Sequence, residues 1–223
     1  IPQGVKEIDT HAFFNNNYLK YIIMPTTLSY IGENAFVNCK SLISILISNT
    51  VTKIVASAFY NCINLEKILI SDSVTNIGVY AFTNTAWYNN QPDGMIIVGK
   101  VLYEYKGNMP ENTELIIPKG IVSITAQAFF NRSNLVSIVI PDGVTSIGSN
   151  AFDFCSNLKN ISIPESIISI GSLTFDNTAW YDEQPDGMIF VGKVLYKYKG
   201  NTTENVIIPD GILNLIINSF PPL

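Results

Sequence analysis

Apolar residues recur along the chain with a period of 23 residues. The motif V/I/L-x-x-I-x-x-x-A-F is followed six residues after Phe by Leu and then by x-x-I-x-I. Copies start at Val5, Leu28, Val51, Val74, Ile121, Val144 and Ile167, with a partial copy at Ile212 that contains Ser219-Phe220. A unit of this length cannot bury its own apolar face, so repeats of this kind stack into one continuous core.

Each repeat contains two short alternating segments and one compact turn. Stretches such as "LVSIVIP" alternate apolar and polar residues, which predicts a strand with its Leu and Ile side chains inward. "VTSIG" predicts a second extended piece on the opposite side of the coil, and "SNAFDFCSNL" predicts an irregular or 3₁₀ turn because it is too short for a stable helix. The pattern predicts a β-rich repeat solenoid of about ten coils, the last incomplete.

Two coils carry an insertion of nearly identical sequence. The segments 85–108 and 178–201 share 20 of 24 positions, and "MIIV-GK-VLYEY" predicts a type II′ hairpin because its two-residue turn begins with Gly. The expected pairs are Val98–Val101, Ile97–Leu102 and Ile96–Tyr103, with Glu104 in a solvated site. We expect one solenoid domain over residues 1–223, composed of regular coils 1–84, an inserted coil 85–120, regular coils 121–177, an inserted coil 178–211 and a partial coil 212–223.

The repeats resemble a known family. "IGENAFVNCKSLISILI" and "IGSNAFDFCSNLKNISIP" are similar to the BspA-type leucine-rich repeat of bacterial and some protist surface proteins, and the likeness covers essentially the whole chain. This resemblance implies a curved leucine-rich-repeat solenoid, secretion or cell-wall attachment, and a protein-binding or host-binding role. It implies no enzymatic activity.

Outward positions of the longer strands form the first candidate binding surface. One row is apolar and should face solvent on the concave side, where exposed apolar patches often mark interaction sites. The alternative is that branched residues there merely favour strand structure. The candidate residues from this row and the row beside it are Tyr21, Ile23, Ser44, Leu46, Lys67, Leu69, Glu114, Ile116, Ser137 and Val139.

Aromatic residues of the inserted coils form the second candidate surface. They could make an aromatic rim that contacts a partner, or they could cover the core where the regular Leu is missing. The second interpretation is favoured because large aromatic side chains usually bury most of their area. The residues are Trp87, Tyr88, Tyr103, Tyr105, Trp180, Tyr181, Tyr196 and Tyr198.

Two further sets of equivalent positions, one with cysteines and one with asparagines, indicate a structural role rather than a catalytic or metal-binding one. Cys39 and Cys62 occupy the same slot of adjacent coils, so a disulfide between them is not excluded by distance, while Cys155 has no such neighbour. Small buried thiols are the simpler interpretation. An Asn precedes this slot in six coils, and Phe154 replaces it once. We expect the amides to satisfy backbone groups between coils.

Charge and reactive residues exclude several functions. The net charge is −5 and no Lys/Arg cluster is present, so we expect no nucleic-acid partner. The apolar runs are too short for a membrane helix, so we expect no membrane insertion. His11 is the only histidine and shares its slot with Asn34, Ser57 and Tyr80, so we expect no catalytic site, metal or cofactor.

The sequence therefore predicts a non-catalytic module of an extracellular or wall-attached bacterial protein. Its partner would be a protein or a glycan. The alternative is a spacer that displays another domain of a longer protein.

Overall fold

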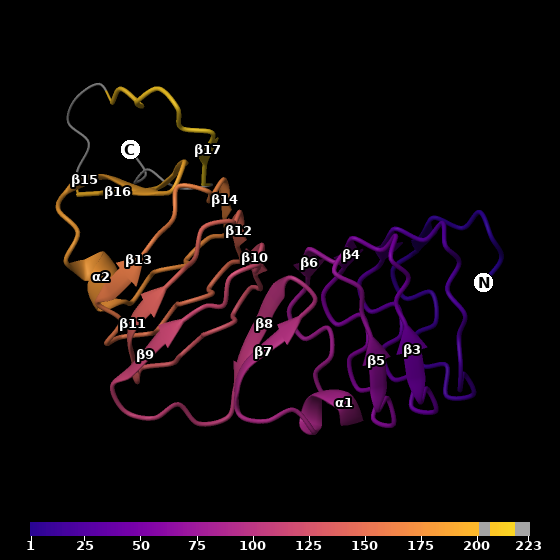
Figure 1. Cartoon of the computed structure of the whole chain (residues 1–223). Helices are drawn as coiled ribbons and strands as arrows, with labels where there is room; N and C mark the ends of the chain where they lie inside the picture. The colour runs from indigo at the N-terminus through magenta and orange to yellow at the C-terminus, as the bar shows by residue number, and fades with distance from the viewer. Residues whose placement is uncertain (201–205, 217–223) are drawn as a thin grey trace. The chain divides into compact units, whose positions relative to one another are not determined.

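The computed structural model describes residues 1–200 and 206–216. It confirms the predicted β-solenoid with coils of about 23 residues, and it has about nine turns where about ten coils were expected (Figure 1). The chain forms two compact units, residues 1–106 and 107–223, and a single domain over residues 1–223 stays a prediction. The Ser219-Phe220 pair of the partial coil lies outside the described residues.

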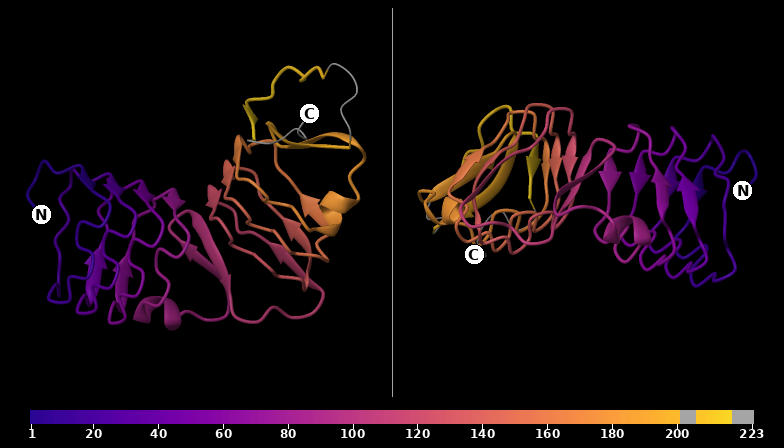
Figure 2. Two further views of the ribbon diagram at one scale, coloured as in Figure 1. Left: turned by 180° about the vertical axis from the view of Figure 1, so that it is seen from behind. Right: turned by 60° about the horizontal axis from the view of Figure 1, so that its bottom comes forward.

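Parallel strands in the first unit follow the 23-residue repeat. β3 (Ser44–Leu46) pairs with β5 (Lys67–Leu69), and Tyr21 extends this ladder through a single bridge to Ser44. Figures 1 and 2 show these strands and the strands of a second parallel sheet at different edges of the coils. That sheet is formed by β1 (Glu7–Ile8), β2 (Tyr30–Ile31), β4 (Lys53–Ile54) and β6 (Asn76–Ile77).

The second unit repeats this arrangement. β11 (Leu135–Val139) pairs in parallel with β9 (Thr113–Ile116) on one side and with β13 (Asn160–Ser162) on the other. The shorter strands β10 (Ser123–Ile124), β12 (Ser146–Ile147) and β14 (Ser169–Ile170) pair in parallel in the same order. Inward Ile residues such as Ile138 and Ile147 are buried, as the alternating pattern predicts.

Stacked phenylalanine rings form the centre of each unit. The rings of Phe13, Phe36, Phe59 and Phe82 lie 4.9–5.7 Å apart and within 7° of parallel. Phe129, Phe152 and Phe175 repeat this ladder at 5.1 and 5.3 Å. The Ala-Phe segment is a succession of turns in which an N–H donates to the carbonyl three residues earlier, as from Cys39 to Phe36. The expectation of an irregular turn is confirmed.

Two residues of each regular coil adopt the left-handed backbone conformation, and this explains the asparagine row. Asn15, Asn38 and Asn61 have φ of 58–60°, a region that Asn tolerates better than most residues. Asn38 Nδ2 also donates to Asn15 Oδ1 at 2.7 Å, so the amides bond across coils. The second position holds His11, Asn34, Ser57, Tyr80, Gln127, Asn150 and Leu173, all with φ of 55–62°.

Replacing Leu173 with asparagine is expected to stabilise the protein by about 1 kcal/mol, because the left-handed conformation costs most L-residues roughly 1–2 kcal/mol and asparagine adopts it more readily. Leu173 has φ of 58° and is 45% exposed, so little packing is lost. Urea denaturation of the purified chain measures the change. Ile168→Asn is the control, since Ile168 is 46% exposed and has no positive φ. An equal gain from both substitutions would contradict the conformational explanation.

Each inserted coil contains a one-turn helix and a hairpin. The helices are α1 (Ala86–Asn89) and α2 (Ala179–Asp182). The hairpin strands are β7 (Gly94–Val98) with β8 (Val101–Lys106), and β15 (Gly187–Val191) with β16 (Val194–Lys199). β16 also pairs in parallel with β17 (Asn214–Leu215).

The predicted hairpin register is right for two pairs and wrong for the third. Val98 faces Val101 and Ile97 faces Leu102, but a bulge places Ile96 opposite Glu104 instead of Tyr103. Gly99 has φ of 57° and Lys100 has no positive φ, as a type II′ turn requires. The bulge lets consecutive residues of β8, Leu102 and Tyr103, both lie in the interior.

Candidate binding surface

The apolar row of the longer strands is exposed in both units. In the first unit Ile23, Leu46 and Leu69 are 81%, 63% and 64% exposed on three successive coils. In the second unit Ile116 is 72% exposed and Val139 is also exposed. Because their neighbours along the strand, such as Ile45 and Ile138, are buried, the outward direction follows from the pleat of the strands. The row therefore forms an apolar stripe over three successive coils of the first unit and over two coils of the second unit, where Ser162 follows Val139.

The second row lies beside the stripe and is mostly polar. Ser44 faces Tyr21 on one side and Lys67 on the other, and all three lie in one ladder. Glu114 faces Ser137 in the second unit. Tyr21, Lys67 and Glu114 are exposed, while both serines are half-buried. The structure thus brings the candidate residues of each unit together, with polar groups bordering apolar ones.

A groove follows the strand ends in each unit. In the first unit a groove of about 550 Å³ is lined by the exposed stripe and by the residues that follow it, including Thr26, Ser48, Asn49 and Ser71. In the second unit a groove of about 640 Å³ is bordered by Lys119, Asp142 and Glu165. Sequence reasoning missed both grooves, although the 23-residue spacing of their border residues was visible.

The eight aromatic residues of the second candidate surface are buried or half-buried, in line with the favoured interpretation that they cover the core. Tyr103, Tyr105 and Tyr196 are buried, so their rings are not available to a partner. The Tyr103 ring packs edge-on against Phe82 at 5.6 Å, and its hydroxyl accepts a hydrogen bond from the Phe82 N–H at 3.1 Å. The half-buried residues are Trp87, Tyr88, Trp180, Tyr181 and Tyr198.

The tryptophans continue the phenylalanine ladder. Trp87 contacts the Phe82 ring at 5.4 Å, and Trp180 contacts the Phe175 ring at 5.0 Å. The Trp87 N–H also donates to the Leu65 carbonyl at 2.7 Å, which joins the inserted coil to the regular coil before it. Each tryptophan therefore packs against the last phenylalanine of the ladder that precedes it.

A lysine clamp holds each one-turn helix, and sequence reasoning missed it. Lys106 Nζ donates to the carbonyls of Tyr88, Asn89 and Gln91 at 2.5–3.1 Å. Lys199 makes the same three contacts in the second copy at 2.7–3.3 Å. At the other end of α1, Thr85 Oγ1 accepts from the Tyr88 N–H at 3.0 Å. The sequence signal for this contact was that a lysine occupies the same position, Lys106 or Lys199, in both inserted coils.

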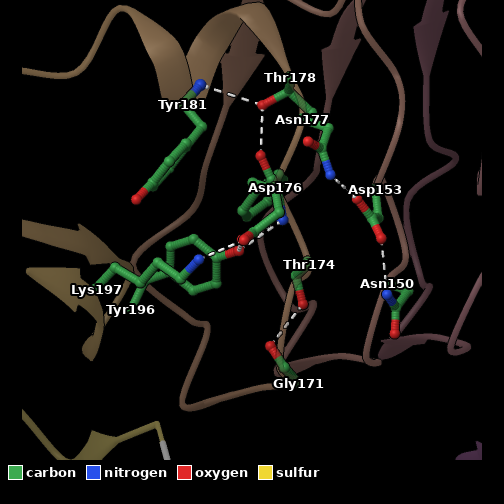
Figure 3. Close-up of polar contacts among 11 residues, drawn as sticks. Asn150, Asp153, Gly171, Thr174, Asp176, Asn177, Thr178, Tyr181, Tyr196 and Lys197 are labelled. Carbon is green, nitrogen blue, oxygen red and sulfur yellow. Dashed lines mark hydrogen bonds and ion pairs between the residues drawn. The ribbon is translucent and has the colours of Figure 1, made fainter. Parts of the chain in front are cut away.

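The two inserted coils differ in one polar cluster. In the second copy the Tyr196 hydroxyl donates to Asp176 Oδ1 at 2.5 Å, and Lys197 forms an ion pair with Oδ2 of the same carboxylate (Figure 3). Burial, and then the hydrogen bond to Asp176, raise the pKa of Tyr196. In the first copy Glu104 instead accepts from the Tyr88 hydroxyl at 3.0 Å. The expected solvated site at Glu104 is therefore wrong.

Figure 3 also explains the break in the asparagine row. Asn177 Nδ2 donates to Asp153 Oδ1, and Asn150 Nδ2 donates to Asp153 Oδ2, both at 2.8 Å. Asp153 is buried beside Phe154, which occupies the asparagine slot with φ of 59°. The Asp153 carboxylate therefore accepts the hydrogen bond from Asn177 that an asparagine at position 154 would accept in the regular row.

The cysteines are buried free thiols. Each Sγ donates to a backbone carbonyl of the preceding coil, as Cys155 does to Phe129 at 3.0 Å. Burial raises the pKa of Cys155 to about 12. The side-chain hydrogen bond with Cys39, together with burial, raises the pKa of Cys62. Cys62 and Cys155 are therefore poor nucleophiles, because the thiolate is the reactive form.

The lone histidine lies on the surface. His11 is exposed and its ring contacts Phe14 edge-on at 5.2 Å. In residues 1–200 and 206–216, no three His, Cys, Asp or Glu side chains gather as metal ligands. No helix in the described part of the chain has the length and apolar character to cross a bilayer.

Comparison with solved structures finds several bacterial leucine-rich-repeat proteins. A leucine-rich-repeat protein of T. pallidum is 24% identical, with a TM-score of 0.41 over 79% of this chain and 71% of the other. A leucine rich cell surface protein of Faecalibacterium prausnitzii is 26% identical, with a TM-score of 0.38 over 95% and 56%. A leucine-rich-repeat protein of Bacteroides ovatus is 20% identical, with a TM-score of 0.38 over 97% and 67%. The chain thus spans between about half and three quarters of these proteins.

Comparison with curated proteins found no match. Among family models, that of the BspA type leucine rich repeat region matches six copies, over residues 1–93 and 98–220. The 23-residue register, the phenylalanine ladders and the buried thiol slot agree with a stacked leucine-rich repeat. The chain belongs to the BspA-type leucine-rich-repeat family.

Proposed function

We propose that this chain is a non-catalytic, protein-binding module of an extracellular or wall-attached bacterial surface protein. The observation that carries the proposal is the apolar stripe at Ile23, Leu46 and Leu69, beside the groove of the first unit. Exposed contiguous apolar surface that is bordered by polar groups is typical of interaction sites. Membership of the BspA-type family supports the bacterial surface location.

The buried aromatic residues support the strand face over the inserted coils as the binding surface. The buried Tyr103 and Tyr196 hydroxyls each accept a hydrogen bond from a backbone N–H of the core. Lys106 and Lys199 donate to backbone carbonyls at the ends of the one-turn helices. The near identity of the inserted coils is thus accounted for by internal contacts. The apolar stripe has no such internal role, since its side chains point away from the core.

Binding of residues 1–223 to host-matrix proteins and to a glycan array, measured by surface plasmon resonance, tests the proposal. Leu46→Glu should weaken binding of the protein ligand that is found by about ten-fold or more, because it places a charge in an apolar contact. Ile63→Glu is the control, since Ile63 is exposed outside the strands. Unchanged binding by Leu46→Glu would rule out the strand face. Absence of any ligand would favour the spacer, and a ligand found only among glycans would contradict a protein partner.

A further inference from the structure

The longer strands of the first unit end in an open edge. β5 is the last strand of its sheet, whose order is β3–β5 (Figure 1). The N–H of Ile47, just after β3, donates to the Leu69 carbonyl of β5 at 2.9 Å, so Leu69 directs its backbone groups toward β3. Alternate residues of a strand bond to opposite sides. The backbone groups of Ile68, and of Ile70 just after β5, therefore point to the side on which the sheet ends.

Neither the backbone nor the side chains on this side are fully covered. Among the residues that the structure describes, no group accepts a hydrogen bond from the N–H of Ile68 or Ile70. The side chains of both residues are half-buried, whereas Ile45 and Ile47 at the equivalent positions one coil earlier are buried. An edge strand with free N–H and C=O groups is a template for pairing with another chain.

The following coil does not supply the strand that would close this edge. At the positions 23 residues after β5 the chain has Asn90, Gln91 and Pro92. Asn90 caps the end of α1, and Pro92 has no N–H to donate to a ladder. The chain then enters β7, which pairs with β8 and not with β5. The sheet therefore lacks one strand where the inserted coil interrupts the regular repeat.

The equivalent edge of the second unit, at β13, is spanned by an ion pair. Lys159, just before β13, lies 2.7 Å from Glu183 of the following inserted coil, measured from Nζ to Oε1. The corresponding residues of the first unit are Glu66 and Asn90, and they form no ion pair because Asn90 is uncharged. The edge of β5 is therefore the one at which no ion pair stands between the strand and the next coil.

We propose that β5 binds an extended segment of a protein partner as an added strand. The backbone of the segment exchanges hydrogen bonds with Ile68 and Ile70, and its inward apolar side chains cover these two isoleucines. In such strand addition the main-chain hydrogen bonds give affinity and alternate side chains give selectivity. Leu69, Ile70 and Ser71 also line the groove of the first unit, so the added strand continues the apolar stripe. This inference rests on the proposed function, because it gives the binding mode of a partner at the same strand face.

Synthetic peptides with the sequence of residues 135–140, flanked by lysines for solubility, test the inference. N-methylation of alternate residues removes the N–H groups from one edge of a peptide strand and keeps its side chains. Two such peptides, methylated on opposite edges, are compared with the unmethylated peptide by NMR of the backbone amides of the full chain. One methylated peptide should bind at least about ten-fold more weakly than the other, because only one edge meets β5. The shifted amides should include Ile68 and Ile70.

A matched pair of proline variants supplies the second measurement. Ile70→Pro removes an N–H that has no partner in the described residues, a change that an edge strand tolerates. It should weaken binding of the unmethylated peptide by about ten-fold or more. Ile163→Pro makes the same change 93 positions later, just after β13, and should leave the affinity unchanged. The same amide spectra report whether each variant is folded.

Several results would overturn the inference. They are absence of peptide binding, equal affinities of the two methylated peptides, and equal effects of the two proline variants. Shifts at Ile68 that depend on protein concentration without peptide would also overturn it, because they would assign the edge to a second copy of the chain. A host protein that Leu46→Glu releases, together with equal affinities of the methylated peptides, would leave the proposed function standing and overturn only the added strand.

Discussion

Replacing Lys106 with methionine is expected to lower the free energy of unfolding by about 3 kcal/mol. The substitution removes three hydrogen bonds from an ammonium group to the carbonyls of Tyr88, Asn89 and Gln91. A hydrogen bond to a charged group contributes roughly 1.5–3 kcal/mol, and three bonds from one half-buried group do not add fully. The clamp also places a positive charge at the carbonyl end of a helix, which is favourable. Urea denaturation measures the change.

Lys100→Met is the matched control, because Lys100 is an exposed lysine in the turn of the same hairpin. It should alter the free energy of unfolding by less than about 0.5 kcal/mol, as surface substitutions usually do. Lys199→Met in the second inserted coil should reproduce the loss, since Lys199 makes the same contacts. A loss no larger for Lys106→Met than for Lys100→Met would show that the clamp does not contribute to stability.

The core and strands of the regular coils were predictable because the residues that form them recur in the motif. The Ala-Phe pair gives the ring ladder, and the alternation in "LVSIVIP" fixes which strand residues face outward. The same alternation predicts that Leu46 and Val139 face solvent, and both side chains are exposed. The left-handed backbone at Asn15 and His11 was not predicted, since the side chain at His11 varies from coil to coil.

The structure of the inserted coils was predictable only where it depends on residues that are close in sequence. The glycine of the turn fixed the first two hairpin pairs, but the third depends on a contact between residues 21 positions apart. The Tyr103 hydroxyl reaches the Phe82 N–H, and the bulge follows from burying Tyr103 beside Leu102. The role of Lys106 is equally non-local, because its carbonyl partners lie 15–18 residues earlier.

The grooves depend on how strand ends are arranged in space, which the repeat period alone does not give. The sequence shows that Asp142 and Glu165 share a slot. It does not show that this slot borders an apolar floor built from Ile117, Ile140 and Pro164. The first candidate surface was therefore predicted as a row of residues, and the structure adds the hollow at its end.

Raising the pH from about 9 to about 11 is expected to destabilise the protein partly through Tyr103. Burial raises the pKa of Tyr103 to about 12, whereas an unfolded tyrosine has a pKa near 10. Below about pH 10 both states keep the proton. Above it the unfolded state loses the proton first, so stability falls by about 1.4 kcal/mol per pH unit until the folded tyrosine also ionises near pH 12. The contribution of Tyr103 therefore declines by about 1.4 kcal/mol by pH 11 and by up to about 2.7 kcal/mol above pH 12.

Tyr103→Phe isolates this effect in urea denaturation at both pH values. The variant should be less stable at about pH 9 by about 1–3 kcal/mol, because the buried Phe82 N–H loses its acceptor. Its further loss on going to about pH 11 should be smaller than that of the unchanged protein by about 1.4 kcal/mol. Tyr196, Cys62 and Cys155, whose pKa values are also raised, titrate in both proteins and cancel in the difference. Equal losses would mean that Tyr103 ionises as readily in the folded state as in the unfolded state, and that its hydroxyl is not held in the interior.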